Sequence, residues 1–243
     1  MSEQKQQIEQ QECKAVSQEE KQETSSIAKK SILSTFLIGF YDRSVVMTYI
    51  GLAFAVVGIC FAYVTNLTWS VVCLIVAGVC DMFDGKIARA CKNRTEEAKD
   101  FGVQIDSLCD TVAFVVLPVL ISLEMGHQGP ISITVCVLYV LAGVIRLAYF
   151  NVLAAKADKS SPMKFYTGLP VTSAAVIFPT LWLISRFIQR LSTTILFDAF
   201  MFITAVLFVS RLRFRKPKGI AYYIFTLIAV IGIVVLLYLQ YGR

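Results

Sequence analysis

Seven long apolar runs constrain this chain more than any other feature of its sequence. Runs long enough to cross a bilayer, about 20 residues each, lie near 45–65, 70–91, 102–124, 131–155, 169–188, 194–210 and 219–241. The composition agrees, with 56% hydrophobic residues, 16% charged residues and a mean hydropathy of +0.66. Since this is too apolar for an ordinary soluble domain, the sequence predicts an all-α, polytopic transmembrane bundle of about seven spans.

The first 44 residues have a different character. Residues 1–28 contain seven Gln, six Glu and three Lys with few apolar residues, which is typical of a disordered or loosely helical tail. Residues 29–44, KKSILSTFLIGFYDRS, combine paired lysines with Ile, Leu and Phe. This mixture favours an interfacial helix in the headgroup region before the first span, and a plain extension of that span is the alternative.

Lys and Arg gather on alternate loops, which predicts the orientation, because short cytoplasmic loops are enriched in cations. With the N-terminal tail inside, the outer side holds only Arg186, Arg190 and Arg243. The inner segments hold Lys86, Arg89, Lys92, Arg94, Lys99, Lys156, Lys159, Lys164, Arg211, Arg213, Arg215, Lys216 and Lys218. We therefore expect an integral membrane protein with a cytoplasmic N-terminus, whose net charge of +6 reflects topology and anionic lipid rather than nucleic acid.

The cysteines and the one histidine do not indicate a catalytic or metal-binding site. Seven cysteines lie mostly within the apolar runs and form no CxxC pair, so we expect reduced thiols. His127 lies in the sequence MGHQGP, far along the chain from the aspartates described next. A histidine-based triad or a histidine-rich zinc site is not predicted.

Four aspartates at the edges of apolar runs are the most informative feature. The stretch 81–110 reads DMFDGKIARACKNRTEEAKDFGVQIDSLCD. At about 100° per residue, one helical arc of roughly 140° holds Asp81, Asp84, Gly85, Ala88 and Arg89, and a second arc of roughly 80° holds Gly102, Asp106 and Asp110. Two antiparallel helices joined by residues 91–99 can turn all four carboxylates towards one another.

Clustered carboxylates at a membrane edge need cations, since they repel and are costly to desolvate. Oxygen ligands without His or thiolate partners favour Mg²⁺, Mn²⁺ or Ca²⁺, and such ions also bind substrate phosphates. Gly85 and Gly102 leave room beside the backbone, and Arg89 offers a fork for phosphate oxygens. The residues predict a metal-assisted phosphate site facing the cytoplasm. Structural ion pairing with Lys86, Arg89 and Lys92, or an ion-transport site, are the alternatives.

The spacing D-x-x-D-G-x-x-A-R followed by G-x-x-x-D-x-x-x-D resembles the signature of the CDP-alcohol phosphatidyltransferases. It is matched by Asp81, Asp84, Gly85, Ala88, Arg89, Gly102, Asp106 and Asp110. Between the Arg and the second Gly, the family usually has about eight residues and this chain has twelve, from Ala90 to Phe101. Four extra residues are about one helical turn, so the loop can absorb them.

This resemblance implies an enzyme with two divalent ions, Mg²⁺ or Mn²⁺, bound by the four aspartates. It implies that the diphosphate of CDP-diacylglycerol is held there, contacted or given room by Asp81, Asp84, Gly85, Ala88, Arg89 and Gly102. An alcohol hydroxyl then attacks the lipid-side phosphorus and CMP leaves, with Asp110 as a metal ligand or as the general base. Similar enzymes are commonly homodimers.

Two later segments indicate the acceptor alcohol. GVIRLAYFNV (143–152) and KFYTGLPVTSAA (164–175), with LFVSRLRF (207–214), resemble phosphatidylserine synthases, although Tyr149 stands where Arg is usual and the P-N-x-x-T Asn is absent near Thr48. The resemblance covers residues 45–218, a six-helix core to which residues 219–243 add one helix. It implies L-serine as acceptor, with inositol, inositol phosphate or glycerol phosphate as alternatives.

Three residues of these segments are candidates for binding the acceptor: Arg146, Asn151 and Gly168. Arg146 is a cation inside an apolar run and therefore needs a partner, either a substrate carboxylate or an internal aspartate. Asn151 can bind an amino acid or cap the loop, and Gly168 with Pro170 forms either a pocket or simply a helix start.

Overall fold

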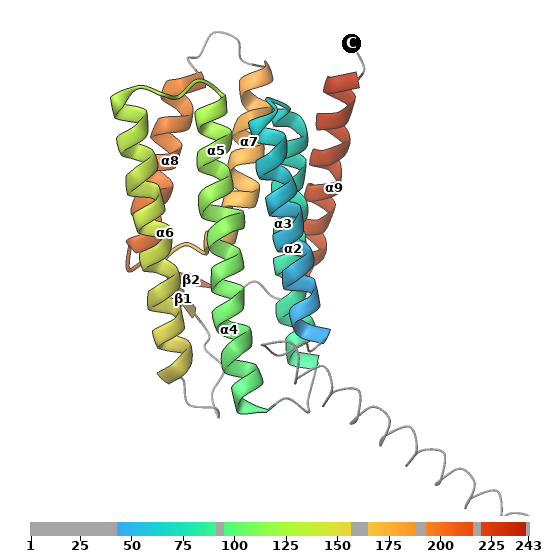
Figure 1. Ribbon diagram of the computed structural model, residues 1–243, viewed down its shortest axis with the longest axis vertical. Coiled ribbons are helices and arrows are strands. Elements are labelled where there is room, and N and C mark those ends of the chain that lie inside the picture. Colours follow the sequence, from blue (N-terminus) through green and yellow to red (C-terminus); the bar gives the residue numbers. More distant parts are fainter. Residues whose placement is uncertain (1–42, 91–94, 157–164, 188–192, 216–219, 242–243) are drawn as a thin grey trace, which may run out of the picture. The chain divides into compact units, whose positions relative to one another are not determined.

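The part of the chain that the computed structural model describes is almost entirely helical (Figure 1). The described residues are 43–90, 95–156, 165–187, 193–215 and 220–241. The predicted tail (1–28) and all but the last two residues of the predicted interfacial helix (29–44) lie outside them. The elements are α2 (Arg43–Tyr63), α3 (Leu67–Ala90), α4 (Glu96–Asp110), η1 (Thr111–Val116), α5 (Leu117–Glu124), α6 (Pro130–Lys156), β1 (Phe165–Thr167), η2 (Val171–Ser173), α7 (Ala174–Phe187), α8 (Thr193–Val209), β2 (Arg213–Arg215) and α9 (Ile220–Tyr241).

The helices confirm the predicted all-α membrane class. Four segments are long and apolar enough to cross a bilayer, namely Val45–Tyr63, Leu67–Ile87, Glu96–Glu124 and Pro130–Ala155. Three shorter apolar helices cover Val171–Ser185, Ile195–Val209 and Thr226–Tyr241. Within the described residues, these seven segments correspond to the seven apolar runs of the sequence.

The hairpin of α2 and α3 is closely packed. A Cβ added at Gly58 would lie 2.9 Å from the Cβ of Cys73, so only glycine permits this approach. The Ser70 hydroxyl donates to the Gly58 carbonyl at 2.8 Å, which satisfies a buried polar group inside the apolar pair. This packing fixes α2 against the helix that carries the first two aspartates.

A π-helical turn interrupts the third apolar segment. Figure 1 shows α4 and α5 as one continuous green rod, and η1 joins them directly after Asp110. At the other end of α4 the Thr95 hydroxyl caps the helix by accepting from the Ala98 amide at 3.2 Å. Glu96 and Glu97 occupy the first turn, where the helix dipole favours acidic residues.

A short antiparallel pair of strands was not predicted from the sequence. β1 pairs with β2 in the register Phe165↔Arg215, Tyr166↔Phe214 and Thr167↔Arg213. The Gly168 amide continues the pairing by donating to the Leu212 carbonyl at 2.8 Å. The pair thus joins the segment before α7 to the segment after α8.

Candidate active site

Three of the four predicted aspartates converge where α3 and α4 face each other. Asp81 and Asp84 lie one turn apart on α3, and Asp106 lies on α4. Each offers a carboxylate oxygen, and these oxygens all lie within 4.8 Å of one another. The arrangement predicted from helical spacing is therefore present for these residues.

Asp110 belongs to the same cluster, one turn beyond Asp106 and next to η1. Its side chain is buried and lines a small cavity with Asp81 and Asp84. The remaining residues that line this cavity are Thr48, Gly51, Leu52, Ala77, Cys109, Ala113 and Phe114. The lining of the cavity is therefore partly acidic and partly apolar.

A threonine from the first span completes the cluster and was not predicted as a site residue. The Thr48 hydroxyl donates to Asp84 Oδ2 at 3.0 Å, and both side chains are buried. Since a carboxylate oxygen that accepts this bond cannot rotate freely, Thr48 fixes the orientation of Asp84. A polar residue inside an apolar run is the sequence signal that could have identified it.

The other residues of the aspartate signature occupy the same two helices. Gly85 follows Asp84 on α3, and Gly102 lies one turn before Asp106 on α4, both partly exposed. Ala88 and Arg89 lie in the last turn of α3, and their side chains are outside the described part of the structure. Their predicted contacts with a diphosphate stay predictions.

The three acceptor candidates separate into two environments. Arg146 on α6 is buried, its guanidinium lies 5.5 Å from the centre of the Phe150 ring, and a Cβ added at Gly168 would come within 3.3 Å of its Nε. Arg146 and Gly168 are therefore neighbours, as expected for one pocket. Asn151 instead accepts from the Ser107 hydroxyl at 2.7 Å and donates to Gln104 Oε1 at 3.3 Å, so its amide ties α6 to α4.

The donor set of the aspartate cluster fits a divalent metal. Carboxylates this close repel one another, and burial adds the cost of desolvating each charge. A divalent cation relieves both effects, and oxygen-only ligands are those that Mg²⁺, Mn²⁺ and Ca²⁺ prefer. The cluster can therefore bind a hard divalent ion, as the sequence predicted.

A second polar cluster lies at the opposite end of the helices. The buried His127 Nδ1 is 3.0 Å from the Ser122 hydroxyl and 3.6 Å from Asp198 Oδ1, and Ser132 donates to Asp198 Oδ2 at 2.5 Å. Burial lowers the pKa of His127, and the Asp198 charge raises it by a smaller amount. Serine and aspartate share one ring nitrogen, whereas a catalytic triad places them on different nitrogens, so these three side chains are not arranged as a triad.

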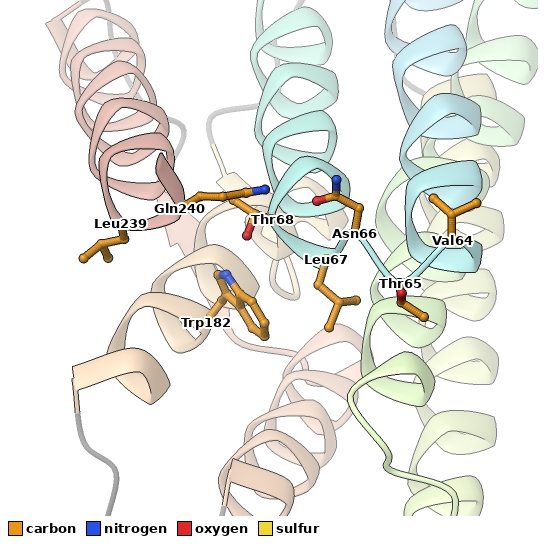
Figure 2. Close-up of a pocket in the computed structure, with 8 residues that line it drawn as sticks. All are labelled: Val64, Thr65, Asn66, Leu67, Thr68, Trp182, Leu239 and Gln240. Atoms are coloured by element: carbon orange, nitrogen blue, oxygen red, sulfur yellow. The ribbon is translucent and has the colours of Figure 1, made fainter. Parts of the chain in front are cut away.

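A larger cavity of about 570 Å³ also lies away from the aspartates (Figure 2). Its lining consists of Val64, Thr65, Asn66, Leu67, Thr68, Trp182, Leu239 and Gln240. Thr68 precedes Asp81 by thirteen helical residues on α3, a separation of about 20 Å. With neutral side chains only, this cavity lacks the charged groups that phosphate chemistry needs.

Comparison with known proteins gives one family. A sequence model of CDP-alcohol phosphatidyltransferases matches residues 44–238. A CDP-diacylglycerol–serine O-phosphatidyltransferase of Helicobacter pylori is 36% identical over 152 residues, which are 60% of this chain and 61% of that protein. The protein of the same name from Saccharomyces cerevisiae is 36% identical over 107 residues, 42% of this chain and 37% of that protein. An archaetidylserine synthase of Methanothermobacter thermautotrophicus is 32% identical over 155 residues, 63% of this chain and 61% of that protein. The matched region thus spans less than two thirds of each relative.

Proposed function

Because this chain belongs to the CDP-alcohol phosphatidyltransferase family, we propose that it transfers the phosphatidyl group of CDP-diacylglycerol to the hydroxyl of L-serine. The products are phosphatidylserine and CMP. The observation that carries the proposal is the convergence of Asp81, Asp84 and Asp106, whose carboxylate oxygens lie within 4.8 Å of one another. The names of the relatives support serine as the acceptor.

In this proposal Asp81, Asp84, Asp106 and Asp110 hold two Mg²⁺ or Mn²⁺ ions. When bound, the ions neutralise the carboxylates and polarise the phosphates of the nucleotide lipid. Thr48 keeps Asp84 in its ligand orientation through the hydroxyl bond. Gly85 and Gly102 leave space for the diphosphate, and Ala88 and Arg89 at the end of α3 complete its binding site.

Asp110 is the proposed general base. The serine oxygen forms a bond to the lipid-side phosphorus, and its proton passes to a carboxylate oxygen of Asp110. The bond between that phosphorus and the bridging oxygen breaks, and CMP leaves with the electron pair. Asp110 is buried among lining residues that include Leu52, Ala113 and Phe114, and this burial would keep bulk water from competing with the alcohol.

Arg146 is the proposed partner of the serine carboxylate. A buried guanidinium suits a carboxylate, because a charge-assisted bond is strong where water is scarce. Gly168 borders the same position, since any side chain there would press on Arg146. Asn151 is proposed to line the acceptor region from its position between α6 and α4, although its amide already bonds to Ser107 and Gln104.

A test of the function measures CMP release by purified protein in detergent with CDP-diacylglycerol, Mn²⁺ or Mg²⁺ and a panel of alcohols. Serine-dependent CMP release is the expected result. Release with inositol, inositol phosphate or glycerol phosphate instead would keep the reaction and change the acceptor. Metal flux in liposomes without any CMP release would indicate that the protein is a transporter and not an enzyme.

We also propose that the N-terminus and the aspartate site face the cytoplasm, on the strength of the cation distribution. Residues 1–28 would form a polar cytoplasmic tail and 29–44 an interfacial helix. Residues 45–218 would form the catalytic domain, to which 219–243 add a helix, and resemblance favours a homodimer.

Since His127 is buried, labelling should use single cysteines at the exposed Glu97 and Gln128 in a cysteine-free background. Opposite-side labelling is expected, and same-side labelling would overturn the topology. Cross-linking in native membranes tests the dimer.

A further inference from the structure

The π-helical turn between Asp110 and Pro118 has a definite cause in the sequence. In an α-helix the Phe114 carbonyl would accept from the amide of residue 118, but proline has no N–H. The proline ring also collides with the carbonyl four residues earlier in a regular helix. Widening the turn relieves this collision, and the Leu117 amide accordingly donates five residues back, to the Val112 carbonyl.

Tyr139 on α6 supplies a donor for the Phe114 carbonyl. Its hydroxyl lies 2.7 Å from the Phe114 oxygen in a fully buried position. The Tyr139 ring packs against the rings of Phe178 and Phe208, whose centroids lie 5.7 Å and 5.5 Å from its own. The aromatic neighbours thus hold the hydroxyl against the widened turn.

The backbone of α6 lies directly against the same turn. A Cβ added at Gly143, one helical turn after Tyr139, would lie 2.7 Å from Val115 Cγ2. This close approach leaves no space for η1 to change its path on that side. Tyr139 and Gly143 therefore hold the turn from one helix face.

The widened turn changes which side of the helix faces the bundle. In an uninterrupted α-helix, Ile121 and Ser122 would lie roughly 60° and 160° around the axis from Asp106. One additional residue in the turn rotates the following segment back by about 100°. The four buried residues of α5, Leu117, Pro118, Ile121 and Ser122, then lie between roughly 80° on one side and 60° on the other side of the Asp106 direction. The aspartates of α4 and the buried side chains of α5 therefore face the same interior of the bundle.

We propose that Tyr139 is a positioning residue for the aspartate site, acting through the Phe114 carbonyl to keep the π-helical turn open. The turn sets the rotation of α4, and so directs Asp106 and Asp110 at Asp81 and Asp84 on α3. The inference rests on the proposed function in so far as those aspartates bind the metal. Tyr139 itself touches neither substrate nor metal.

The experiment compares Tyr139→Phe, Pro118→Ala and the double variant with the unmodified protein. Two quantities are measured in detergent: Mn²⁺ binding, from the electron paramagnetic resonance signal of free Mn²⁺, and the thermal unfolding midpoint. Tyr238→Phe, which removes an exposed hydroxyl from α9, is the matched control. Tyr139→Phe should weaken Mn²⁺ binding about tenfold, as loss of a group that supports metal ligands commonly does, whereas the control should not change it.

The double variant separates positioning from simple stabilisation. Alanine at 118 returns an N–H for the Phe114 carbonyl, so the unfolding midpoint should recover while the turn closes and Mn²⁺ binding stays weak. Recovery of both quantities would overturn the proposal, because Tyr139 would then only satisfy a buried carbonyl. Unchanged Mn²⁺ binding in Tyr139→Phe would overturn it too.

If Tyr139→Phe alone does not fold, the double variant decides. If the unmodified protein binds Mn²⁺ but releases no CMP, the proposed function is wrong, and the effect of Tyr139 on Mn²⁺ binding can still be measured.

Discussion

The Thr48 hydroxyl donates to Asp84 Oδ2 at 3.0 Å, and this bond joins the first span to the part of the acidic cluster that lies on the second. The substitution Thr48→Val keeps the shape of the side chain and removes the hydroxyl that donates to Asp84. We expect apparent Mn²⁺ affinity in the CMP-release assay to fall about tenfold, as for other residues that orient metal ligands. Thr48→Ser retains a hydroxyl and should remain near the unmodified protein. Equal losses in Val and Ser variants would point to packing rather than to the bond.

The metal prediction concerns Asp81 and Asp106. EDTA should abolish CMP release, and Mg²⁺ or Mn²⁺ should restore it, because the clustered carboxylates need a divalent cation. Asp81→Asn and Asp106→Asn should each lose activity even at high metal concentration. The exposed Asp100 on α4 provides the control, since Asp100→Asn should leave turnover unchanged. Full turnover in metal-free buffer would rule out the proposed chemistry.

Arg146 provides a test of the serine acceptor. If its guanidinium binds the serine carboxylate, Arg146→Ala should raise the KM for serine about tenfold to a hundredfold, because a charge-assisted hydrogen bond contributes roughly 1.5 to 3 kcal/mol. CDP-diacylglycerol affinity should survive. Steady-state kinetics with each substrate varied in turn separates the two quantities. An unchanged serine KM would remove Arg146 from the acceptor site, and a parallel loss of both affinities would indicate an internal ion pair.

Gly168 and Gly126 form a matched pair for testing the proposed acceptor site. Both have positive φ, +80° and +90°, which alanine adopts only with strain. A Cβ at Gly168 would lie 2.7 Å from the Phe208 carbonyl, whereas nothing lies within 4 Å of one at Gly126. Gly168→Ala should therefore cost about 1 to 3 kcal/mol more in free energy of unfolding than Gly126→Ala, and it alone should raise the serine KM. Equal effects on chemical denaturation would contradict the close contact.

His127 predicts a pH dependence of stability. Its pKa is lowered chiefly by burial, so the folded protein takes up the proton only below the pH at which the unfolded chain does, about 6.5. The contribution of His127 to the free energy of unfolding is therefore fully present above about pH 6.5 and declines as the pH falls below that value. The unfolding midpoint of the unmodified protein should fall more steeply between pH 7.5 and 5.5 than that of His127→Asn. Parallel curves would show that His127 makes no such contribution.

The sequence alone determined the helices and the faces that carry charge. Apolar runs of bilayer length specify spans, because backbone groups in hydrocarbon must bond within the helix. Spacings of three and four residues place Asp81 with Asp84, and Asp106 with Asp110, on common faces, because an α-helix repeats every 3.6 residues. Both features depend only on local periodicity, so they could be predicted without any knowledge of packing.

Only the tertiary structure decided which side chains support those faces. Thr48 meets Asp84 across 36 residues of sequence, Asn151 meets Ser107 across 44, and Tyr139 meets the Phe114 carbonyl across 25. Pro118 signals a disturbed helix, but the donor that the Phe114 carbonyl finds in the wide turn is a tyrosine from another span. The β1–β2 pair and the burial of His127 against Asp198 likewise need partners distant in the chain. Such contacts follow from how helices pack, which periodicity does not encode.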